Sequence, residues 1–149
     1  MIPIFGPPPR LGIRYRRRPG AYAILLDAGR ILLTEQATDD GPDLQLPGGG
    51  IDPGEAPLPA LAREVLEETG HTCRVLRRVG VFRQFNWMPE YRIHAEKVCA
   101  VYLCQPGLRP GPPTEAGHRA VWMTPDTAVA RLPAPGSAAI LRRVLSGAG

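Results

Sequence analysis

The sequence predicts an α/β fold, in which a mixed β-sheet carries helices on both faces. Apolar runs of strand length alternate with turn residues along the chain, and three segments have helical character. Strands mixed with helices are typical of a sheet between helical layers, because each element buries its apolar side against another. The 149 residues suit one domain, 1–149, and contain no evident internal repeat.

The N-terminal half should begin with an arm and continue as strands. Residues 1–19 form a Pro- and Arg-rich arm, which should be irregular over 1–12. Apolar runs at 20–26 and 30–36 flank Asp27-Ala28-Gly29, which is the pattern of a β-hairpin. The next predicted elements are a polar loop at 37–43 and a short strand at 44–47.

The C-terminal half should contain further strands and two helices. The predicted strands are 73–85, 91–104 and 120–123, with a turn at 86–90 and a Pro- and Gly-rich loop at 105–117. Thr124 can cap a helix over 126–132, with Pro125 in its first turn, and a last amphipathic helix should begin at Ser137 and run over 137–145.

The most informative segment is LPGGGIDPGEAPLPALAREVLEETGH, from Leu46 to His71. Its second part should be a helix, because Pro57 and Pro59 suit a first turn and Gly70 suits the left-handed residue that ends a helix. One side of this helix is apolar and should pack on a core. The residues on that side are Leu58, Leu61, Ala62, Val65 and Leu66.

Three glutamates share another side of the same helix. Glu64, Glu67 and Glu68 stand at i, i+3 and i+4, so their side chains project from one face and repel one another. Most acidic helix faces are simply solvated. Here, however, four glycines closely precede the helix and allow the backbone to approach a ligand. A divalent cation with oxygen ligands best compensates such crowding.

This segment resembles the signature of the Nudix hydrolases. That signature is Gly, five residues, Glu, seven residues, Arg-Glu, an aliphatic residue, any residue, Glu-Glu, any residue, Gly and an aliphatic residue. The matching positions are Gly49, Glu55, Arg63-Glu64, Val65, Glu67-Glu68 and Gly70. His71 departs from the signature, at a position that packs rather than reacts.

The resemblance implies an α/β/α sandwich and metal-dependent hydrolysis of a nucleoside diphosphate linked to another group. Examples are nucleoside triphosphates, nucleotide sugars, ADP-ribose and dinucleoside polyphosphates. The cofactor would be Mg²⁺ or Mn²⁺, which clamps phosphate oxygens and activates water. The resemblance implies Glu64, Glu67 and Glu68 as metal ligands, joined by the Gly48 carbonyl. Gly49, Glu55 and Gly70 would be structural.

The remaining catalytic roles are less sharply marked. The general base is either Glu64 or Glu115, which lies in the Pro-rich loop; Glu90 and Glu96 are weaker candidates. Arg63 can pair with Glu67 or Glu64 and hold the carboxylate in place, so we include it in the catalytic group.

Substrate contacts are the least defined part of the site. Phe85 and Trp87, with the neighbouring Arg83, are the candidates, because an exposed aromatic ring can stack on a nucleobase. Such residues are also often core. The subfamily stays open, and a non-catalytic nucleotide- or RNA-binding module is the alternative function. Such modules typically lose glutamates of the signature, and this chain keeps all of them.

Composition indicates an ordinary globular protein. Hydrophobic residues make up 44% and charged residues 21% of the chain. No apolar run approaches the roughly 20 residues that span a membrane, and the N-terminus lacks the order of a secretory signal. We therefore expect no membrane partner. The resemblance implies a monomer or homodimer that acts on small nucleotides, and the simplest compartment is the cytoplasm.

Cysteines, histidines and charge add little to the site. Three cysteines without paired spacings predict neither disulfides nor a zinc site, and Cys99 and Cys104 should be buried. His71, His94 and His118 are scattered and show no metal-ligand spacing. Much of the net charge of +4 comes from arginines between positions 10 and 18. A solvated edge is the simplest explanation for them, and a nucleic-acid partner is the less favoured one.

Overall fold

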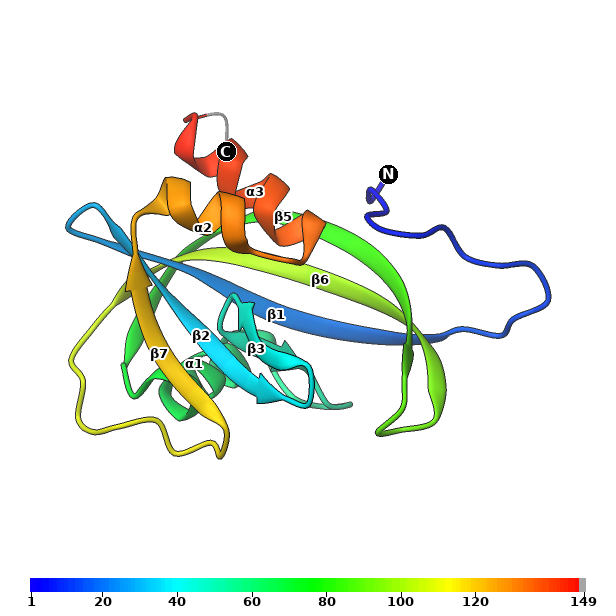
Figure 1. Cartoon of the computed structure of the whole chain (residues 1–149), viewed down its shortest axis with the longest axis horizontal. Helices are drawn as coiled ribbons and strands as arrows, with labels where there is room; N and C mark the ends of the chain where they lie inside the picture. The colour runs from blue at the N-terminus through cyan, green and yellow to red at the C-terminus, as the bar shows by residue number, and fades with distance from the viewer. Residues whose placement is uncertain (148–149) are drawn as a thin grey trace.

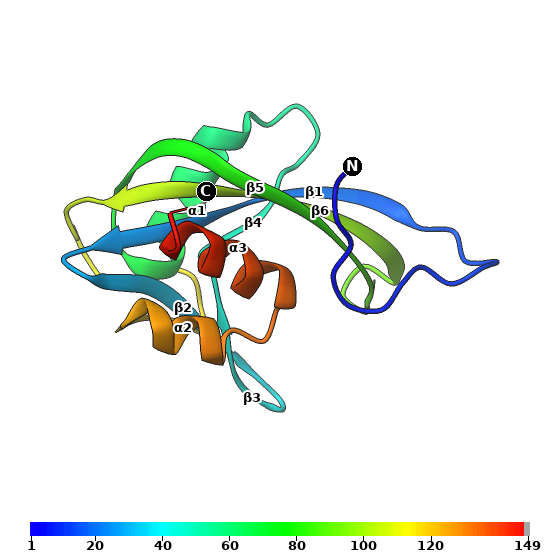
Figure 2. The ribbon, with the colours of Figure 1, turned by 90° about the horizontal axis from the view of Figure 1, so that it is seen from above.

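The computed structural model describes residues 1–147 and contains one mixed sheet with helices on both faces (Figure 1). In chain order the elements are β1 Arg16–Asp27, β2 Arg30–Thr38, β3 Gly41–Gln45, β4 Gly48–Gly50, α1 Pro57–Thr69, β5 Cys73–Met88, β6 Ile93–Pro106, β7 His118–Met123, α2 Pro125–Arg131 and α3 Pro135–Leu145. The main strand order is β3-β2-β1-β6-β5, with β4 paired to β1 and β7 paired to β2. Helix α1 lies on one side of the sheet, and α2 and α3 lie on the other, which confirms the predicted sandwich (Figure 2).

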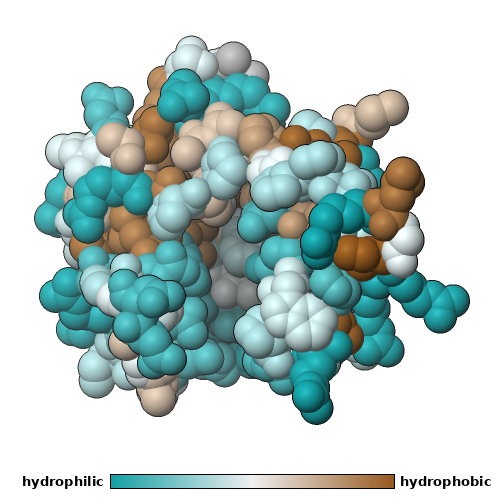
Figure 3. All heavy atoms as spheres, turned by 45° about the vertical axis from the view of Figure 1, so that its right-hand side comes forward, coloured by the Kyte–Doolittle hydropathy of each residue, from teal (hydrophilic) through white to brown (hydrophobic). Residues whose placement is uncertain are grey.

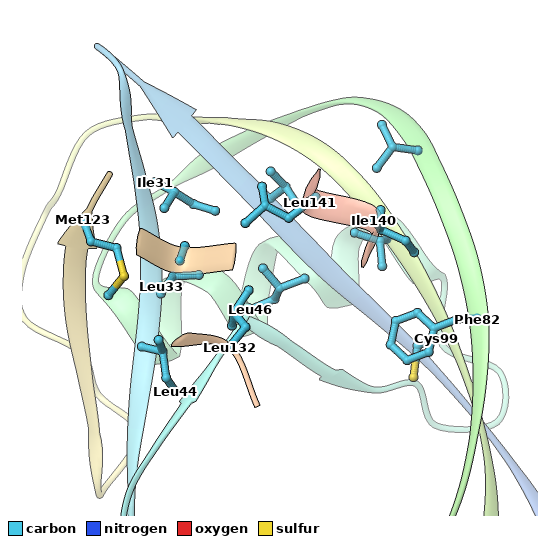
Figure 4. Close-up of a cluster of buried hydrophobic side chains, with 14 residues drawn as sticks. Ile31, Leu33, Leu44, Leu46, Phe82, Cys99, Met123, Leu132, Ile140 and Leu141 are labelled. Carbon is cyan, nitrogen blue, oxygen red and sulfur yellow. The ribbon is translucent and has the colours of Figure 1, made fainter. Parts of the chain in front are cut away.

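The two faces of β1 support different cores, because side chains alternate along a strand. On one face Ile24 packs in a cluster with Leu132, Ile140 and Leu141, the last two from α3 (Figure 4). On the other face small alanines of β1 meet Leu61 and Val65 of α1. The small side chains allow α1 to lie close to the sheet.

The buried stripe of α1 differs from the predicted one. Leu58 and Leu66 were predicted to pack on the core, but they are 43% and 40% exposed. The buried positions instead include Leu61, Val65 and Glu68, which are spaced at i, i+4 and i+7. One of the three glutamates therefore occupies a core-facing position, and this fact is central to the site.

The first predicted hairpin is confirmed. Asp27 pairs with Arg30 across a two-residue turn, in which Ala28 and Gly29 have φ of 49° and 75°. Positive φ at both central residues is the geometry that matches the twist of paired strands. The prediction of buried Cys99 and Cys104 is also confirmed.

The N-terminal arm was predicted too long. Arg16 to Pro19 belong to β1 and pair in parallel with Ala95 to Val98 of β6. Backbone pairing satisfies these residues whatever their side chains, so the charge-rich composition concealed a strand. The arm also touches the sheet edge, where the Phe5 N–H donates to the Arg83 carbonyl at 3.0 Å and the Arg83 N–H donates to the Pro3 carbonyl at 2.8 Å.

Other boundaries also moved. The segment 37–43, predicted as a loop, contains the end of β2, a turn and the start of β3, and the predicted strand at 44–47 ends at Gln45. The predicted turn at 86–90 is displaced to 89–92, because β5 continues to Met88. Helix α3 begins at Pro135 rather than Ser137, since proline suits the first helical position. Strand β7 begins at His118, two residues earlier than predicted.

No helix within residues 1–147 is long and apolar enough to cross a membrane.

Gly70 connects the end of α1 to the loop between β6 and β7. It has φ of 79°, as predicted for a helix end, and a Cβ there would collide with the Gly111 carbonyl oxygen. We expect Gly70→Ala to lower the free energy of unfolding by about 2–4 kcal/mol, measured by chemical denaturation. Gly54→Ala is the matched control, because Gly54 has φ of 82° but no heavy atom within 4 Å of an added Cβ. Equal losses in both variants would contradict the importance of the loop contact.

Candidate functional site

Helix α1 carries its glutamates toward the short strand β4 and the loop that precedes β7. Glu64, Glu67 and Glu115 can each bring one carboxylate oxygen within 4.8 Å of the others. Glu68 and Glu115 form a second such group with His118. The structure therefore gathers the three predicted glutamates of the helix with the predicted loop glutamate.

The glycine segment approaches the helix through its backbone. The Gly48 N–H donates to Glu68 Oε1 at 2.9 Å. Gly48 has φ of 144°, and an added Cβ would lie 2.7 Å from the Tyr22 Cα. At Gly49 an added Cβ would lie 3.2 Å from the carboxyl group of Glu64. Glycine at both positions keeps the backbone close to the carboxylates.

Arg63 ties the signature loop to the acidic face of the helix. Its guanidinium lies 3.0 Å from Glu55 Oε2 and 3.2 Å from Glu67 Oε2, and 3.5 Å from Glu64 Oε1. Glu55 in turn accepts the Asp52 N–H at 3.1 Å. The pairing with Glu67 and Glu64 was predicted, whereas the link to Glu55 was not. Arg63 fixes positions here rather than contributing much stability, because these pairs are partly exposed to solvent.

Backbone hydrogen bonds hold Glu115 in place. The N–H groups of Thr114 and Glu115 both donate to the Glu67 carbonyl at 2.9 Å. That carbonyl lies in the last turn of α1, where helix carbonyls lack partners within the helix. The segment between β6 and β7, which passes the end of α1 in Figure 1, is thus anchored at the residue that faces the carboxylates.

His118 is the residue of the site that sequence reasoning missed. It was predicted to be unrelated to any ligand set, but a ring nitrogen of His118 can lie within 4.8 Å of oxygens of Glu68 and Glu115. Its Nδ1 is 2.9 Å from Thr34 Oγ1. The available signal was the spacing Glu115-x-x-His118, immediately before an apolar strand. Glu-x-x-His is a known ligand spacing, but on helices.

The electrostatics of the cluster favour a cation. Burial raises the pKa of Glu68 to about 8, the Gly48 N–H opposes this, and the neighbouring carboxylates of Glu64, Glu115 and Glu67 raise it further. Burial likewise raises the pKa of Glu64, which Arg63 partly offsets. Within residues 1–147, no arginine or lysine forms an ion pair with Glu68. The donor set of carboxylates and backbone carbonyls is the one that Mg²⁺ and Mn²⁺ prefer, so the residues fit such an ion.

A cleft of about 330 Å³ lies on the face of the sheet that α2 and α3 cover. Its polar lining comes from Asp43 and Gln45 of β3, Gln84 of β5 and Lys97 of β6. Tyr22 also lines the cleft, and the same residue packs against Gly48. The cleft therefore adjoins the glycine segment. The face in Figure 3 is hollowed near its middle, with mainly hydrophilic residues around the hollow.

The predicted substrate residues lie outside this cleft. Trp87 is 49% exposed, and its ring packs on His94. Phe85 meets the Tyr15 ring edge-on, at 5.0 Å between centroids. Arg83 forms an ion pair with Glu96 at 3.1 Å. Glu96, one of the weaker candidates for the general base, is therefore held by this arginine. A substrate role for Trp87, Phe85 and Arg83 stays a prediction.

The arginine cluster faces a second hollow, of about 480 Å³. Arg16, Arg17 and Arg18 line one side, and residues 51–55 of the signature loop line the other. The Arg18 guanidinium lies 4.7 Å from the centre of the Tyr91 ring. Arg16, Arg17 and Arg18 are therefore part of the sheet and border the signature loop, whereas Arg10 and Arg14 precede β1.

Fold and site together define an α/β sandwich protein with a carboxylate cluster suited to a divalent cation. The sequence profile of the NUDIX domain matches residues 16–144, and the chain belongs to the Nudix family. This confirms the resemblance seen in the sequence.

Individual relatives agree with this assignment. The chain is 37% identical over 75 residues to a protein named putative 8-oxo-dGTP diphosphatase of Bacillus subtilis, covering 50% of this chain and 49% of the relative. It is 30% identical over 112 residues to a MutT-like protein of Streptomyces ambofaciens, covering 75% and 66%. The chain spans about half the length, or less, of three curated relatives that it matches. The structure of a NUDIX hydrolase from Nitrosomonas europaea has a similar fold, with a TM-score of 0.72 at 22% identity over 89% of this chain and 90% of the other.

Proposed function

We propose that the protein is a metal-dependent hydrolase that cleaves the pyrophosphate bond of a nucleoside diphosphate linked to another group. The observation that carries this proposal is Glu68, which is only 4% exposed, lies in a carboxylate cluster and, within residues 1–147, forms no ion pair with an arginine or lysine. Burying an ionised carboxylate without a counterion is costly, and protein sites of this kind bind metals. Family membership supports the same chemistry.

Glu67 and Glu68 are proposed as metal ligands, with Glu115 and the Gly48 carbonyl completing the set. A bound Mg²⁺ or Mn²⁺ neutralises phosphate charge and lowers the pKa of a coordinated water. Glu115 belongs to both donor groups, which favours it as a metal ligand. Glu64 belongs to only one of them, so Glu64 is proposed as the general base. Arg63 orients Glu64 and Glu67 and is a positioning residue.

The nucleoside is proposed to occupy the cleft beside β3. The volume of about 330 Å³ lies at the lower end of the range for small-molecule sites. Asp43, Gln45 and Gln84 offer donors and acceptors to a base edge, and Lys97 offers a positive charge. Tyr22 connects the cleft to the glycine segment, and the phosphates of a bound nucleotide are proposed to follow that segment toward the carboxylates of α1.

The different roles proposed for Glu64, the general base, and Glu115, a metal ligand, lead to a kinetic prediction. Glu64→Gln should lower kcat by roughly 10²- to 10⁴-fold, as expected for loss of a general base, while Mn²⁺ still binds. Glu115→Gln should chiefly raise the Mn²⁺ concentration needed for half-maximal rate, and excess metal should restore much of the activity. The measurement is kcat for both variants across a Mn²⁺ series. The reverse pattern would move the base to Glu115.

A substrate panel tests the function itself. It would contain nucleoside triphosphates, oxidised dGTP, nucleotide sugars, ADP-ribose, dinucleoside polyphosphates and capped RNA, each with Mg²⁺ or Mn²⁺. Oxidised dGTP is included because of the name of the Bacillus subtilis relative. Turnover of at least one small nucleotide is expected. Tight binding without turnover would instead indicate a non-catalytic binding module, and activity on RNA that is lost on neutralising Arg16, Arg17 and Arg18 would indicate a nucleic-acid substrate.

A further inference from the structure

Residues 3–5 of the N-terminal arm add a short extra strand to the edge of the sheet. β5 stands at the end of the main strand order, and Ile4 forms a parallel bridge with its residue Arg83. The backbone hydrogen bonds of Phe5 and Pro3 with Arg83 belong to this bridge. Between Phe5 and β1 the chain makes a wide loop away from the sheet (Figure 1). The start of the chain is therefore docked on β5 although most of the arm is not.

The side chain of Phe5 points from this extra strand into the protein. It packs against the core cluster that lies under α2 and α3, and its ring meets the Phe82 ring edge-on at 5.9 Å between centroids. Ile4 is 40% exposed, as expected for the neighbour of an inward-facing residue, because side chains alternate along a strand. Phe5 is thus the anchor of the arm.

Phe82 connects this anchor to the proposed nucleoside cleft. It is 3% exposed, lines the cleft and lies beside Cys99 in the core (Figure 4). An added Cβ at Gly136, the second residue of α3, would collide with the Phe82 ring. The residues around that glycine, Pro135 and Ser137, line the cleft as well. The Phe82 ring therefore contacts the arm and the start of α3, and it forms part of the cleft.

The start of α3 depends on this packing, because no side chain caps it. The N-cap residue Ala134 makes no side-chain cap hydrogen bond. Helix α2 differs, because the Thr124 hydroxyl accepts the Thr127 N–H at its start. A side-chain cap typically stabilises a helix start by about 1 kcal/mol. Without one, the close contact between Gly136 and Phe82 is the feature that locates the first turn of α3 against the sheet.

We propose that Phe5 is a positioning residue for nucleotide binding, which acts by holding Phe82 and the start of α3 as one wall of the cleft. Phe5 itself does not line the cleft. Its contribution is to keep the wall in the binding conformation, so that binding does not bear the cost of ordering it. This inference rests on the proposed placement of the nucleoside in the cleft, and it assigns the N-terminal arm a role in affinity rather than in the chemical step.

Phe5→Ala removes the anchor, and Ile4→Ala is its matched control. Both substitutions shorten an apolar side chain of the same bridge and keep its backbone pairing, but only Phe5 packs against the core cluster. Hydrogen exchange of the nucleotide-free protein, followed by NMR, reports on the wall through the Ala138 N–H, which bonds to the Ala134 carbonyl at 3.1 Å in the first turn of α3. The Ala128 N–H is the internal reference, because it holds the equivalent place in α2.

The Ala138 amide should exchange at least about 10-fold faster in Phe5→Ala relative to the Ala128 amide, and at an unchanged ratio in Ile4→Ala. Taking the ratio removes any general loss of stability, which accelerates both amides. Binding is measured by calorimetry with AMP, GMP, CMP and UMP, which carry no pyrophosphate bond. The dissociation constant of the best of them should rise about 5-fold or more in Phe5→Ala and stay unchanged in Ile4→Ala. On the best panel substrate, KM should rise in Phe5→Ala while kcat stays within about 2-fold.

An exchange ratio and a nucleotide affinity equal to those of wild type in Phe5→Ala would overturn the inference, and so would a fall in kcat at constant KM. If Phe5→Ala does not fold, wild type decides. Coupling is reciprocal, so the nucleotide should slow exchange of the Phe5 N–H, and an unchanged Phe5 rate at saturating nucleotide would contradict the role of the arm. Failure of the proposed function looks different, because wild type would then bind none of the four nucleotides and turn over no member of the panel. The exchange ratio needs no ligand, so it still decides whether the arm holds the wall.

Discussion

Replacing Glu67 by glutamine should lower metal-dependent turnover by roughly 10²- to 10³-fold or more while leaving the fold intact. Glu67 belongs to the donor group formed by Glu64, Glu67 and Glu115. Its carboxylate pairs with the Arg63 guanidinium, and its backbone carbonyl accepts the N–H groups of Thr114 and Glu115. Glutamine keeps the side-chain length but removes the negative charge that is proposed to hold the cation. The measurement is kcat on the best substrate of the panel, with Mn²⁺ affinity determined on the same samples.

Asp40→Asn is the matched control for Glu67→Gln. Asp40 is exposed in the turn between β2 and β3, so neutralising it changes net charge equally without touching the cluster. Its turnover should match that of wild type. Wild-type rates in Glu67→Gln would contradict the assignment of Glu67 as a metal ligand, and unfolding measurements on both variants exclude loss of structure as the cause.

Replacing Glu68 by glutamine should make the metal-free protein more stable at pH 8. The pKa of Glu68 is raised from 4.5 to about 8, chiefly by burial, which at 1.36 kcal/mol per unit sets a ceiling on the order of 5 kcal/mol for the cost of ionising it in the folded state. Glutamine removes that cost, and its amide oxygen can still accept the Gly48 N–H. The measurement is the free energy of unfolding in chelator.

The pH dependence of stability gives the same prediction with a definite sign. Between pH 4.5 and about 8, the folded metal-free protein keeps Glu68 protonated while the unfolded chain ionises it. The folded state binds more protons, so stability falls as pH rises through this window. Glu68→Gln should flatten the fall, and Mn²⁺ should stabilise wild type more than the variant. An unchanged slope, or a variant less stable than wild type in chelator at pH 8, would contradict a costly buried charge.

The site could be predicted from sequence where its residues are close together in the chain. Glu64, Glu67 and Glu68 lie within five residues on one helix, so helical geometry alone places them on one face. Gly70 was predictable for the same reason, because the end of a helix is a local event. The two-residue turn at Ala28-Gly29 was likewise determined by its own sequence.

The features that sequence reasoning did not predict depend on contacts between segments that are distant in the chain. Thr34 and His118 are 84 positions apart and meet only because β7 pairs with β2. Arg16 to Pro19 look like a charged arm until β6 supplies the parallel partner. Burial of Glu68 also could not be read from the helix, since a carboxylate ordinarily faces water and only the sheet and glycine segment enclose it.

The residues that line the cleft also could not be predicted from local sequence. Its lining comes from β1, β3, β5, β6 and the segment that joins α2 to α3, so no local pattern marks it. Phe85 and Trp87, near the turn after β5, gave a local pattern, and the structure places both outside the cleft. Substrate recognition is therefore the least predictable property of this chain from sequence.

The most direct test of the central claim is turnover of the best panel substrate by wild type against free Mg²⁺ or Mn²⁺ in a chelator-buffered series. If the carboxylates around Glu68 hold the cation that enables pyrophosphate cleavage, the rate should be negligible in chelator and should rise to saturation as free metal increases. The same rate with and without chelator would contradict the claim.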